Sequence, residues 1–119
     1  PWDKKPIVMS KKGPGAFEPM TVFDVFEKVV KKFPDRIMFA KEFKTDEGKM
    51  EWKEYSRKTV YDTSKKVARA FIKMGLQDWE GVCIMGFNAP RWVFSYLASM
   101  YAGGLACGIY TTNNPGQCE

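Results

Sequence analysis

The stretch that decides the fold runs from Gly81 to Pro115 and reads GVCIMGFNAPRWVFSYLASMYAGGLACGIYTTNNP. It holds one charged side chain, that of Arg91, although 28% of the 119-residue chain is charged. Three interpretations compete for such a segment: a membrane span, a helix enclosed in a protein core, or the buried centre of a domain whose remainder lies elsewhere.

The segment divides into two apolar runs that flank a helix. Residues 82–87 and 105–110 are short and continuously apolar, which is typical of strands covered on both faces. The Asn-Ala-Pro sequence at 88–90 predicts a helix start capped by Asn88, because proline is favoured in the first turn and asparagine caps well. Residues 91–102 are apolar almost all round, which predicts a helix covered on most sides. Together they predict a right-handed βαβ unit with parallel strands.

A membrane span explains the same run less well. Residues 92–110 are 19 residues without charge, close to the roughly 20 that a spanning helix needs. The adjacent glycines Gly103 and Gly104 interrupt the run, and no basic flank follows it. We therefore expect no transmembrane span.

The N-terminal part of the chain changes character at Thr21. Residues 1–20 carry four prolines and two glycines and are expected to be an irregular lead-in. Thr21 and Asp24 match a capping box, and the apolar residues that follow recur at helical spacing. Pro34 is expected to stop this helix. Residues 21–119 are expected to form one incomplete domain.

A β-hairpin and a long helix come next. Apolar residues alternate with others on either side of a polar, glycine-containing segment at 44–49, which predicts the hairpin. A long amphipathic helix is expected from about Tyr55 to Met74, with Gly75 following its end. Its expected apolar stripe comprises Val60, Thr63, Val67, Ala70, Phe71 and Met74.

Composition excludes several classes of function. The 19 basic and 14 acidic residues give a net charge of +5, but no basic block exceeds two residues, so no nucleic-acid partner is expected. The chain has no histidine, which removes Ser-His and Cys-His nucleophile systems. Cys83 and Cys107 lie in the apolar runs and are expected to be buried thiols. Cys118 lies outside these runs. An odd number of cysteines without a C-x-x-C pair fits a reduced, intracellular setting.

Neutral polar residues follow both predicted strands of the βαβ unit. Ligands of open α/β sheets bind beyond the carboxyl ends of the strands, where this chain has Asn88, Thr111, Thr112 and Asn113. A structural interpretation stays open for each: Asn88 as a helix cap, and the threonines as part of a satisfied turn.

No known phosphate loop or acid pair accompanies them. The segment after Gly86 lacks the Lys-Ser/Thr of a Walker A loop, and the glycines at 103–108 do not form G-x-G-x-x-G. We therefore expect no catalytic, cofactor-binding or metal-binding residue in these 119 residues.

Several motifs recur in a familiar order along residues 17–119. They are Met20-Thr21-Val22, Phe33-Pro34-Asp35-Arg36, Trp52-Lys53-Glu54-Tyr55, the stretch ARAFIKMGL at 68–76, and above all the segment at 81–115. This order resembles the N-terminal segment of the adenylate-forming acyl-CoA synthetases, and is most similar to the long-chain, bubblegum-type branch. The Gly-Ile-Tyr-Thr-Thr piece at 108–112 is the part most specific for that branch. Arg91 stands where the family usually has an acidic residue.

The resemblance implies an α/β fold and a ligase in two steps. ATP and a long-chain fatty acid would give an acyl-adenylate with magnesium, and coenzyme A would then take the acyl group. The family's phosphate loop, adenylate-binding segment, ribose-binding aspartate and catalytic lysine would lie beyond Glu119. The chain itself would supply scaffold and part of the acyl pocket wall, and would bind none of these cofactors alone.

A second class of function stays open. The chain would then be a non-catalytic, synthetase-like interaction module, in which a protein partner covers Gly81 to Tyr110. In either case we expect a cytoplasmic location, with peripheral contact to a membrane as an open alternative.

Overall fold

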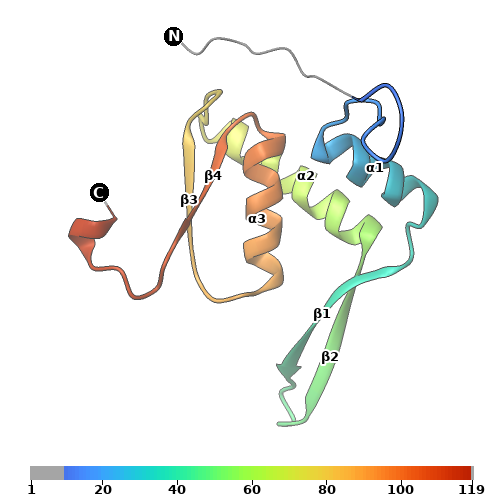
Figure 1. Ribbon diagram of the computed structural model, residues 1–119. Coiled ribbons are helices and arrows are strands. Elements are labelled where there is room, and N and C mark those ends of the chain that lie inside the picture. Colours follow the sequence, from blue (N-terminus) through green and yellow to red (C-terminus); the bar gives the residue numbers. More distant parts are fainter. Residues whose placement is uncertain (1–9, 119) are drawn as a thin grey trace.

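The computed structural model describes residues 10–118. In chain order these residues form α1 (Val22–Lys32), β1 (Ile37–Lys44), β2 (Met50–Ser56), α2 (Arg57–Lys73), β3 (Gly81–Met85), α3 (Pro90–Tyr101), β4 (Leu105–Ile109) and the short 3-10 helix η1 (Pro115–Gln117) (Figure 1). Residues 10–20 contain turns and bends, and residues 1–9 of the expected lead-in lie outside the described part of the chain.

The predicted capping box begins α1. The Asp24 backbone N–H donates to the Thr21 hydroxyl oxygen at 3.1 Å, and the Thr21 N–H donates to the Asp24 carboxylate at 2.9 Å. The Thr21 hydroxyl also donates to the Asp24 carboxylate at 2.7 Å, and this bond, together with the one from the Thr21 N–H, lowers the pKa of the Asp24 carboxyl. The helix ends at its C-cap Phe33, immediately before Pro34, so both predicted boundaries are confirmed.

The hairpin prediction is also confirmed, since β1 and β2 pair antiparallel and project away from the helices (Figure 1). The long helix α2 begins at Arg57 rather than at Tyr55. Tyr55 and Ser56 still belong to β2, and the Ser56 hydroxyl caps the helix by accepting from the Thr59 N–H at 3.2 Å. The sequence prediction was therefore two residues early, because the strand continues up to the cap.

Gly75 ends α2 as predicted. Its φ of 103° lies in the left-handed region, where glycine avoids a steric penalty. The Gly75 N–H donates to Ile72 at 3.0 Å, and the Leu76 N–H donates to Phe71 at 3.1 Å. This pair of bonds is a Schellman motif, which satisfies carbonyls that the helix would otherwise leave unpaired.

The predicted apolar stripe of α2 was partly wrong. The buried residues of α2 are Val60, Ser64 and Ala68, whereas Met74 is 83% exposed. Ala68 packs with Ala98 and Ala102 of α3 in the central cluster. Small side chains let two helices approach closely, so helix–helix contact selected the small residues of α2 over the largest apolar ones.

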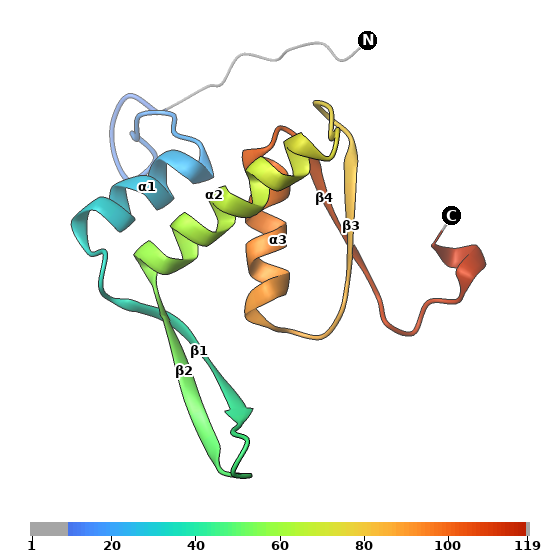
Figure 2. The same cartoon turned by 180° about the vertical axis from the view of Figure 1, so that it is seen from behind.

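The predicted parallel pairing of β3 and β4 is confirmed, with Cys83 opposite Cys107. Helix α3 covers one face of this sheet, where Ile84 is buried. Phe94 of α3 is buried against the hairpin, with its ring centroid 6.0 Å from that of Phe39 and 5.7 Å from that of Tyr55. Figures 1 and 2 show α3 lying between the β3–β4 sheet and α2. The molecule thus has a strand–helix–helix order of layers, as in one half of an α/β domain.

Residues 10–118 cover only one face of strands β3 and β4, so coverage of the second face by the remainder of the protein stays a prediction. Met85 and Leu105 are about half exposed on the face away from α3, and the expected buried thiols Cys83 and Cys107 are exposed too. One helix layer can cover only one face of a two-stranded sheet. The prediction for α3 was correct on the sides that meet α2, the hairpin and the sheet, where Pro90, Phe94, Ala98 and Ser99 are buried.

Candidate functional site

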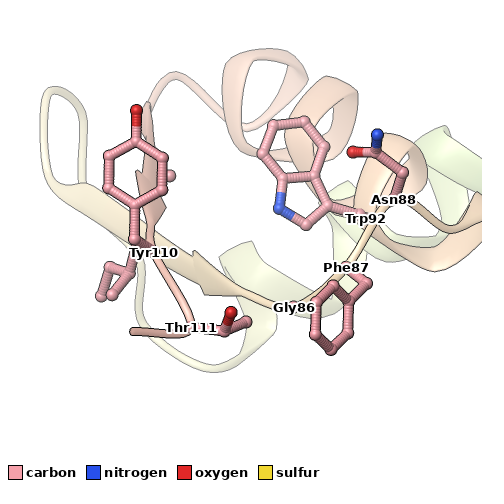
Figure 3. A pocket seen from close by; sticks show the side chains of 8 residues that line it. Gly86, Phe87, Asn88, Trp92, Tyr110 and Thr111 are labelled. Carbon is pink, nitrogen blue, oxygen red and sulfur yellow. The ribbon is translucent and has the colours of Figure 1, made fainter. Parts of the chain in front are cut away.

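The carboxyl ends of β3 and β4 border a hollow of about 430 Å³ (Figure 3). This volume lies within the range of small-molecule sites. The lining residues come from the β3–α3 turn, the first turn of α3 and the end of β4: Gly86, Phe87, Asn88, Trp92, Gly108, Ile109, Tyr110 and Thr111. The hollow therefore lies at the edge of the sheet where ligands of α/β folds bind.

Trp92 forms the wall on the helix side. It is half-buried in the first turn of α3, and its ring stacks on that of Tyr96 with centroids 5.4 Å apart and planes inclined by 12°. A Cβ atom built on Gly108 would lie 3.5 Å from Trp92 Cζ2. The indole therefore lies over β4 at position 108, at a distance that leaves room for an ordinary van der Waals contact.

Asn88 belongs to the hollow rather than to the helix cap, and the cap prediction was wrong. The N-cap of α3 is Ala89, in extended conformation and without a side-chain hydrogen bond. Pro90 occupies the first helical position, which makes residue 89 the cap and leaves Asn88 one residue too early. The exposed Asn88 side chain lines the hollow instead (Figure 3).

The chain leaves β4 through the predicted polar segment, but only part of it reaches the hollow. Thr111 lines it, together with Tyr110, whereas Thr112 and Asn113 do not. The Asn113 N–H donates to the Tyr110 carbonyl at 3.0 Å, so this segment turns away from the strand. The structure thus brings Asn88 and Thr111 together and leaves the other two candidates outside.

Sequence reasoning missed the aromatic lining. Trp92 and Tyr110 were assigned only to the apolar runs of the helix and strand. Trp92 lies two residues after Pro90, which places it in the turn of α3 nearest to the strand ends. That spacing was the signal available for Trp92, and the short distance from the strand end was the signal for Tyr110.

The lining favours binding over acid–base chemistry. Its polar groups are the Asn88 amide, the Thr111 hydroxyl and the phenol of Tyr110, and its apolar surface comes mainly from the aromatic rings. Among the lining residues there is no carboxylate, amine or guanidinium. No group of three acidic, cysteine or histidine residues that could hold a metal ion occurs in residues 10–118. The lining of this hollow therefore does not fit magnesium or the phosphates of ATP.

The largest resolved pKa shift lies elsewhere, where α1, α2 and α3 meet. Burial raises the pKa of Tyr101 to about 12, and the neighbouring Tyr61 and Glu27 add to the effect. The Tyr61 hydroxyl donates to Glu27 at 2.8 Å, and Lys65 donates to Tyr61 at 3.0 Å. The bond to Tyr61 raises the pKa of Lys65. This network ties α1 to α2.

No helix in the part of the chain that the structure describes combines the length and the apolar character needed to cross a membrane.

Solved structures with the same fold define the class of protein. The N-terminal subdomain of Klebsiella oxytoca NpsA superimposes with a TM-score of 0.63 over 78% of this chain and 22% of its own, at 18% identity. The fatty acid AMP ligase of Legionella pneumophila gives a TM-score of 0.63 over 80% of this chain and 16% of its own, at 16% identity. The fold is therefore that of the N-terminal subdomain of adenylate-forming enzymes.

Sequence comparison defines the family. Residues 26–119 match the family described as AMP-binding enzyme, and the chain belongs to it. It is 39% identical over 111 residues to the long-chain-fatty-acid–CoA ligase ACSBG2 of Gallus gallus, covering 93% of this chain and 14% of that ligase. It is 37% identical over 101 residues to ACSBG1 of Homo sapiens, covering 85% of this chain and 13% of that ligase. The chain thus spans about one seventh of the relatives' length, and the resemblance to the bubblegum-type branch is confirmed.

Proposed function

We propose that this chain is the N-terminal part of a long-chain fatty acid–CoA ligase. The observation that carries the proposal is the 39% identity over 93% of the chain to a curated ligase of that activity. In the proposed reaction the fatty acid carboxylate attacks the α-phosphorus of ATP and displaces pyrophosphate. The thiol of coenzyme A then attacks the acyl-adenylate and displaces AMP. The match to an AMP-binding family supports the use of ATP.

The chain's own part in this reaction is structural and substrate-contacting. The groups that hold ATP, magnesium and coenzyme A would lie in the remainder of the ligase, since the sequence matches no known phosphate-loop motif and residues 10–118 contain no cluster of metal-ligand residues. Residues 21–119 would form the start of the AMP-binding domain, after a lead-in at 1–20. The hollow at the ends of β3 and β4 would form part of the acyl pocket wall, because its lining is aromatic and uncharged.

The proposed location is cytoplasmic, with peripheral contact to a membrane where long-chain fatty acids are found. The unpaired state of Cys83, Cys107 and Cys118 supports a reducing compartment. The net charge of +5 would favour an anionic surface.

The test uses the full-length native polypeptide that contains this sequence. It should form palmitoyl-CoA and AMP from palmitate, ATP, Mg²⁺ and coenzyme A. A polypeptide that forms neither acyl-adenylate nor acyl-CoA from any fatty acid, and binds neither ATP nor palmitate in calorimetry, would contradict the proposal.

A matched pair of variants tests the pocket wall. Trp92→Leu should lower kcat/KM for palmitate by about tenfold, because truncation of a half-buried aromatic side chain in a binding pocket typically costs that much. Trp52→Leu is the control, since Trp52 lies on the hairpin and is 67% exposed. Equal kcat/KM values for the two variants would remove Trp92 from the binding surface.

A further inference from the structure

A second hollow lies between α1 and β1. Helix α1 lies on the other side of α2 and α3 from strands β3 and β4 (Figure 1). The hollow has a volume of about 520 Å³, and its lining is almost wholly apolar. Helix α1 contributes Val22 and Val25, β1 contributes Ile37 and Met38, and α3 contributes Leu97. We call this the α1–β1 groove.

These apolar side chains are unusually open to solvent. Val22 is 72% exposed, Val25 and Ile37 are each 48% exposed, and Met38 is 43% exposed. Exposed apolar side chains gathered around a hollow mark a binding surface more often than isolated exposed ones do.

Three positive charges surround the ring of Phe33, and one of them, that of Arg57, also lines the groove. The guanidinium carbon of Arg36 lies 4.8 Å from the ring centroid, the ammonium nitrogen of Lys32 lies 5.3 Å from it, and the guanidinium carbon of Arg57 lies 5.7 Å from it. The Arg57 N–H donates to the Arg36 carbonyl at 3.0 Å, which fixes the two arginines as neighbours. We call these residues the Phe33 cation cluster.

The cluster lacks a counter-charge within residues 10–118. Both salt bridges of the described residues involve other lysines. The nearest acidic residue in sequence, Asp35, acts on Lys58, whose pKa is raised first by its hydrogen bond with Asp62 and to a smaller extent by Asp35. An added anion would therefore relieve repulsion among three cations and could accept charge-assisted hydrogen bonds from both guanidinium groups.

Arg57 belongs to both features, because it lines the groove and lies over the Phe33 ring. An apolar hollow that adjoins unpaired cations matches a molecule with a hydrocarbon chain and an anionic head. We infer that the α1–β1 groove binds a long-chain fatty acid anion, with its carboxylate at the Phe33 cation cluster and its chain along Val25 and Ile37. The inference rests on the proposed function for the ligand class, but concerns a site separate from the β3–β4 hollow.

The shape of the surface favours a single chain over a bilayer. Proteins that lie on membranes insert projecting apolar side chains among the lipids. Here the apolar side chains line a concavity whose volume lies within the range of small-molecule sites. A held fatty acid at this position would provide a reserve of substrate close to the ligase.

The experiment counts palmitate equivalents bound by the full-length native polypeptide, using equilibrium dialysis with radiolabelled palmitate below its aggregation concentration. The native protein should bind two equivalents, one at the acyl site of the ligase and one in the groove. The double variant Arg36→Gln/Arg57→Gln should lose the groove equivalent, with its affinity weakened about tenfold or more, because two charge-assisted bonds are removed. The control Lys49→Gln, which removes an exposed charge of the hairpin, should keep both.

A second variant guards against misfolding of the first. Val25→Glu places a carboxylate in the groove at a half-exposed position of α1 and leaves the cation cluster intact. It should lose the same single equivalent while the far-ultraviolet circular dichroism stays native. The rate of palmitoyl-CoA formation at saturating palmitate should be unchanged in both variants.

The outcomes separate this inference from the proposed function. Two equivalents, or one, in native protein and variants alike would overturn the groove site. If the native protein binds one equivalent of palmitate and the variants bind none, the result supports the groove site and contradicts the proposed ligase function. If the variants lose both the groove equivalent and palmitoyl-CoA formation at saturating palmitate, the groove is part of the catalytic site, and the inference of a separate binding site is overturned. If the variants lose affinity only for phosphatidylserine vesicles, the groove binds a lipid surface and not a single fatty acid, which overturns the inference.

Discussion

Two glycines near the C-terminus show how single positions control the packing of this chain. A Cβ atom on Gly104 would lie 2.9 Å from the Glu80 carbonyl oxygen and 3.1 Å from Leu76 Cδ2, closer than backbone can accept. A Cβ atom on Gly108 would meet only Trp92, at the ordinary distance of 3.5 Å. The first glycine is therefore required by the fold, and the second permits a side chain.

The two positions give a matched prediction. Gly104→Ala should lower the free energy of unfolding by about 1–3 kcal/mol, since the Glu80 backbone must move. Gly108→Ala should change it by less than about 1 kcal/mol, because the added methyl group fits and also restricts the unfolded chain. Urea unfolding of both variants measures the difference. Equal losses of unfolding free energy in the two variants would mean that the contacts of a Cβ atom at position 104 do not destabilise the fold.

The raised pKa of Tyr101 predicts how the free energy of unfolding changes at alkaline pH. Its hydroxyl is buried without a hydrogen-bond partner in the described residues, and its pKa is raised to about 12 from an ordinary value of 10.0. Between these values the unfolded chain loses the phenol proton more readily than the folded chain does. The contribution of Tyr101 to the free energy of unfolding is therefore fully present below pH 10 and declines as pH rises towards 12.

The test compares the native chain with Tyr101→Phe. The variant should be as stable as the native chain at pH 7, or slightly more so, because an unpaired buried hydroxyl is removed. From pH 10 to 12 its urea midpoint should fall less steeply than that of the native chain. Lys65 is present in both proteins, so its own titration cancels in the comparison. Parallel pH profiles would mean that Tyr101 ionises equally in both states.

At the scale of elements, the start of α3 lacks a side-chain cap. The N-cap Ala89 offers no hydrogen-bond acceptor for the first turn of the helix. Serine at this position would accept from an otherwise unpaired backbone N–H. Ala89→Ser should therefore raise the free energy of unfolding by about 0.5–1 kcal/mol, as measured by urea unfolding.

Asn88→Ala is the matched comparison. Because Asn88 is exposed and does not cap α3, this change should alter the free energy of unfolding by no more than about 0.5 kcal/mol. A loss of about 1 kcal/mol or more would restore Asn88 as the cap and would contradict the assignment of Ala89.

At the scale of the whole molecule, the face of the β3–β4 sheet opposite α3 is open. Cys83 and Cys107 are exposed there, beside the half-exposed Met85 and Leu105. In the isolated 119-residue chain both thiols should react with a maleimide under native conditions. In the full-length native polypeptide we expect both to be protected, because the remainder of an AMP-binding domain would cover an apolar sheet face. Mass spectrometry of labelled peptides measures the reaction in the isolated chain and in the full-length polypeptide. Equal labelling of the two would mean that this sheet face is also open in the full-length protein.

The same face predicts association of the isolated chain, so every urea-unfolding comparison uses the full-length native polypeptide that contains this sequence. Two unpaired strand edges and an apolar face invite contact between copies. Sedimentation of the isolated chain should show oligomers or aggregate, and Leu105→Lys should reduce them. A monodisperse, cooperatively unfolding chain would contradict this expectation.

The sequence by itself determined the elements and their order. The capping box at Thr21, the stop at Pro34 and the Schellman glycine Gly75 are local signals, because each acts through hydrogen bonds or φ values within a few residues. The parallel βαβ unit followed from two apolar runs around one helix. The position of Asn88 and Thr111 at the strand ends also followed, since parallel strands end at the same edge.

Only the tertiary structure decided what depends on the approach of distant residues. Ser64 and Ala68 follow Val60 at four-residue spacing, but their full burial depends on the close packing of α2 on α3, which the sequence of α2 alone does not contain. The exposure of Cys83 and Cys107 depends on how many layers cover the sheet, and the apolar runs indicated two where residues 10–118 supply one. The Phe33 cation cluster unites residues from the end of α1 and the start of α2, because the backbone bond from Arg57 to Arg36 brings these termini together. Local hydrogen bonding can be predicted from neighbours in sequence, whereas packing partners are fixed only when the whole chain has folded.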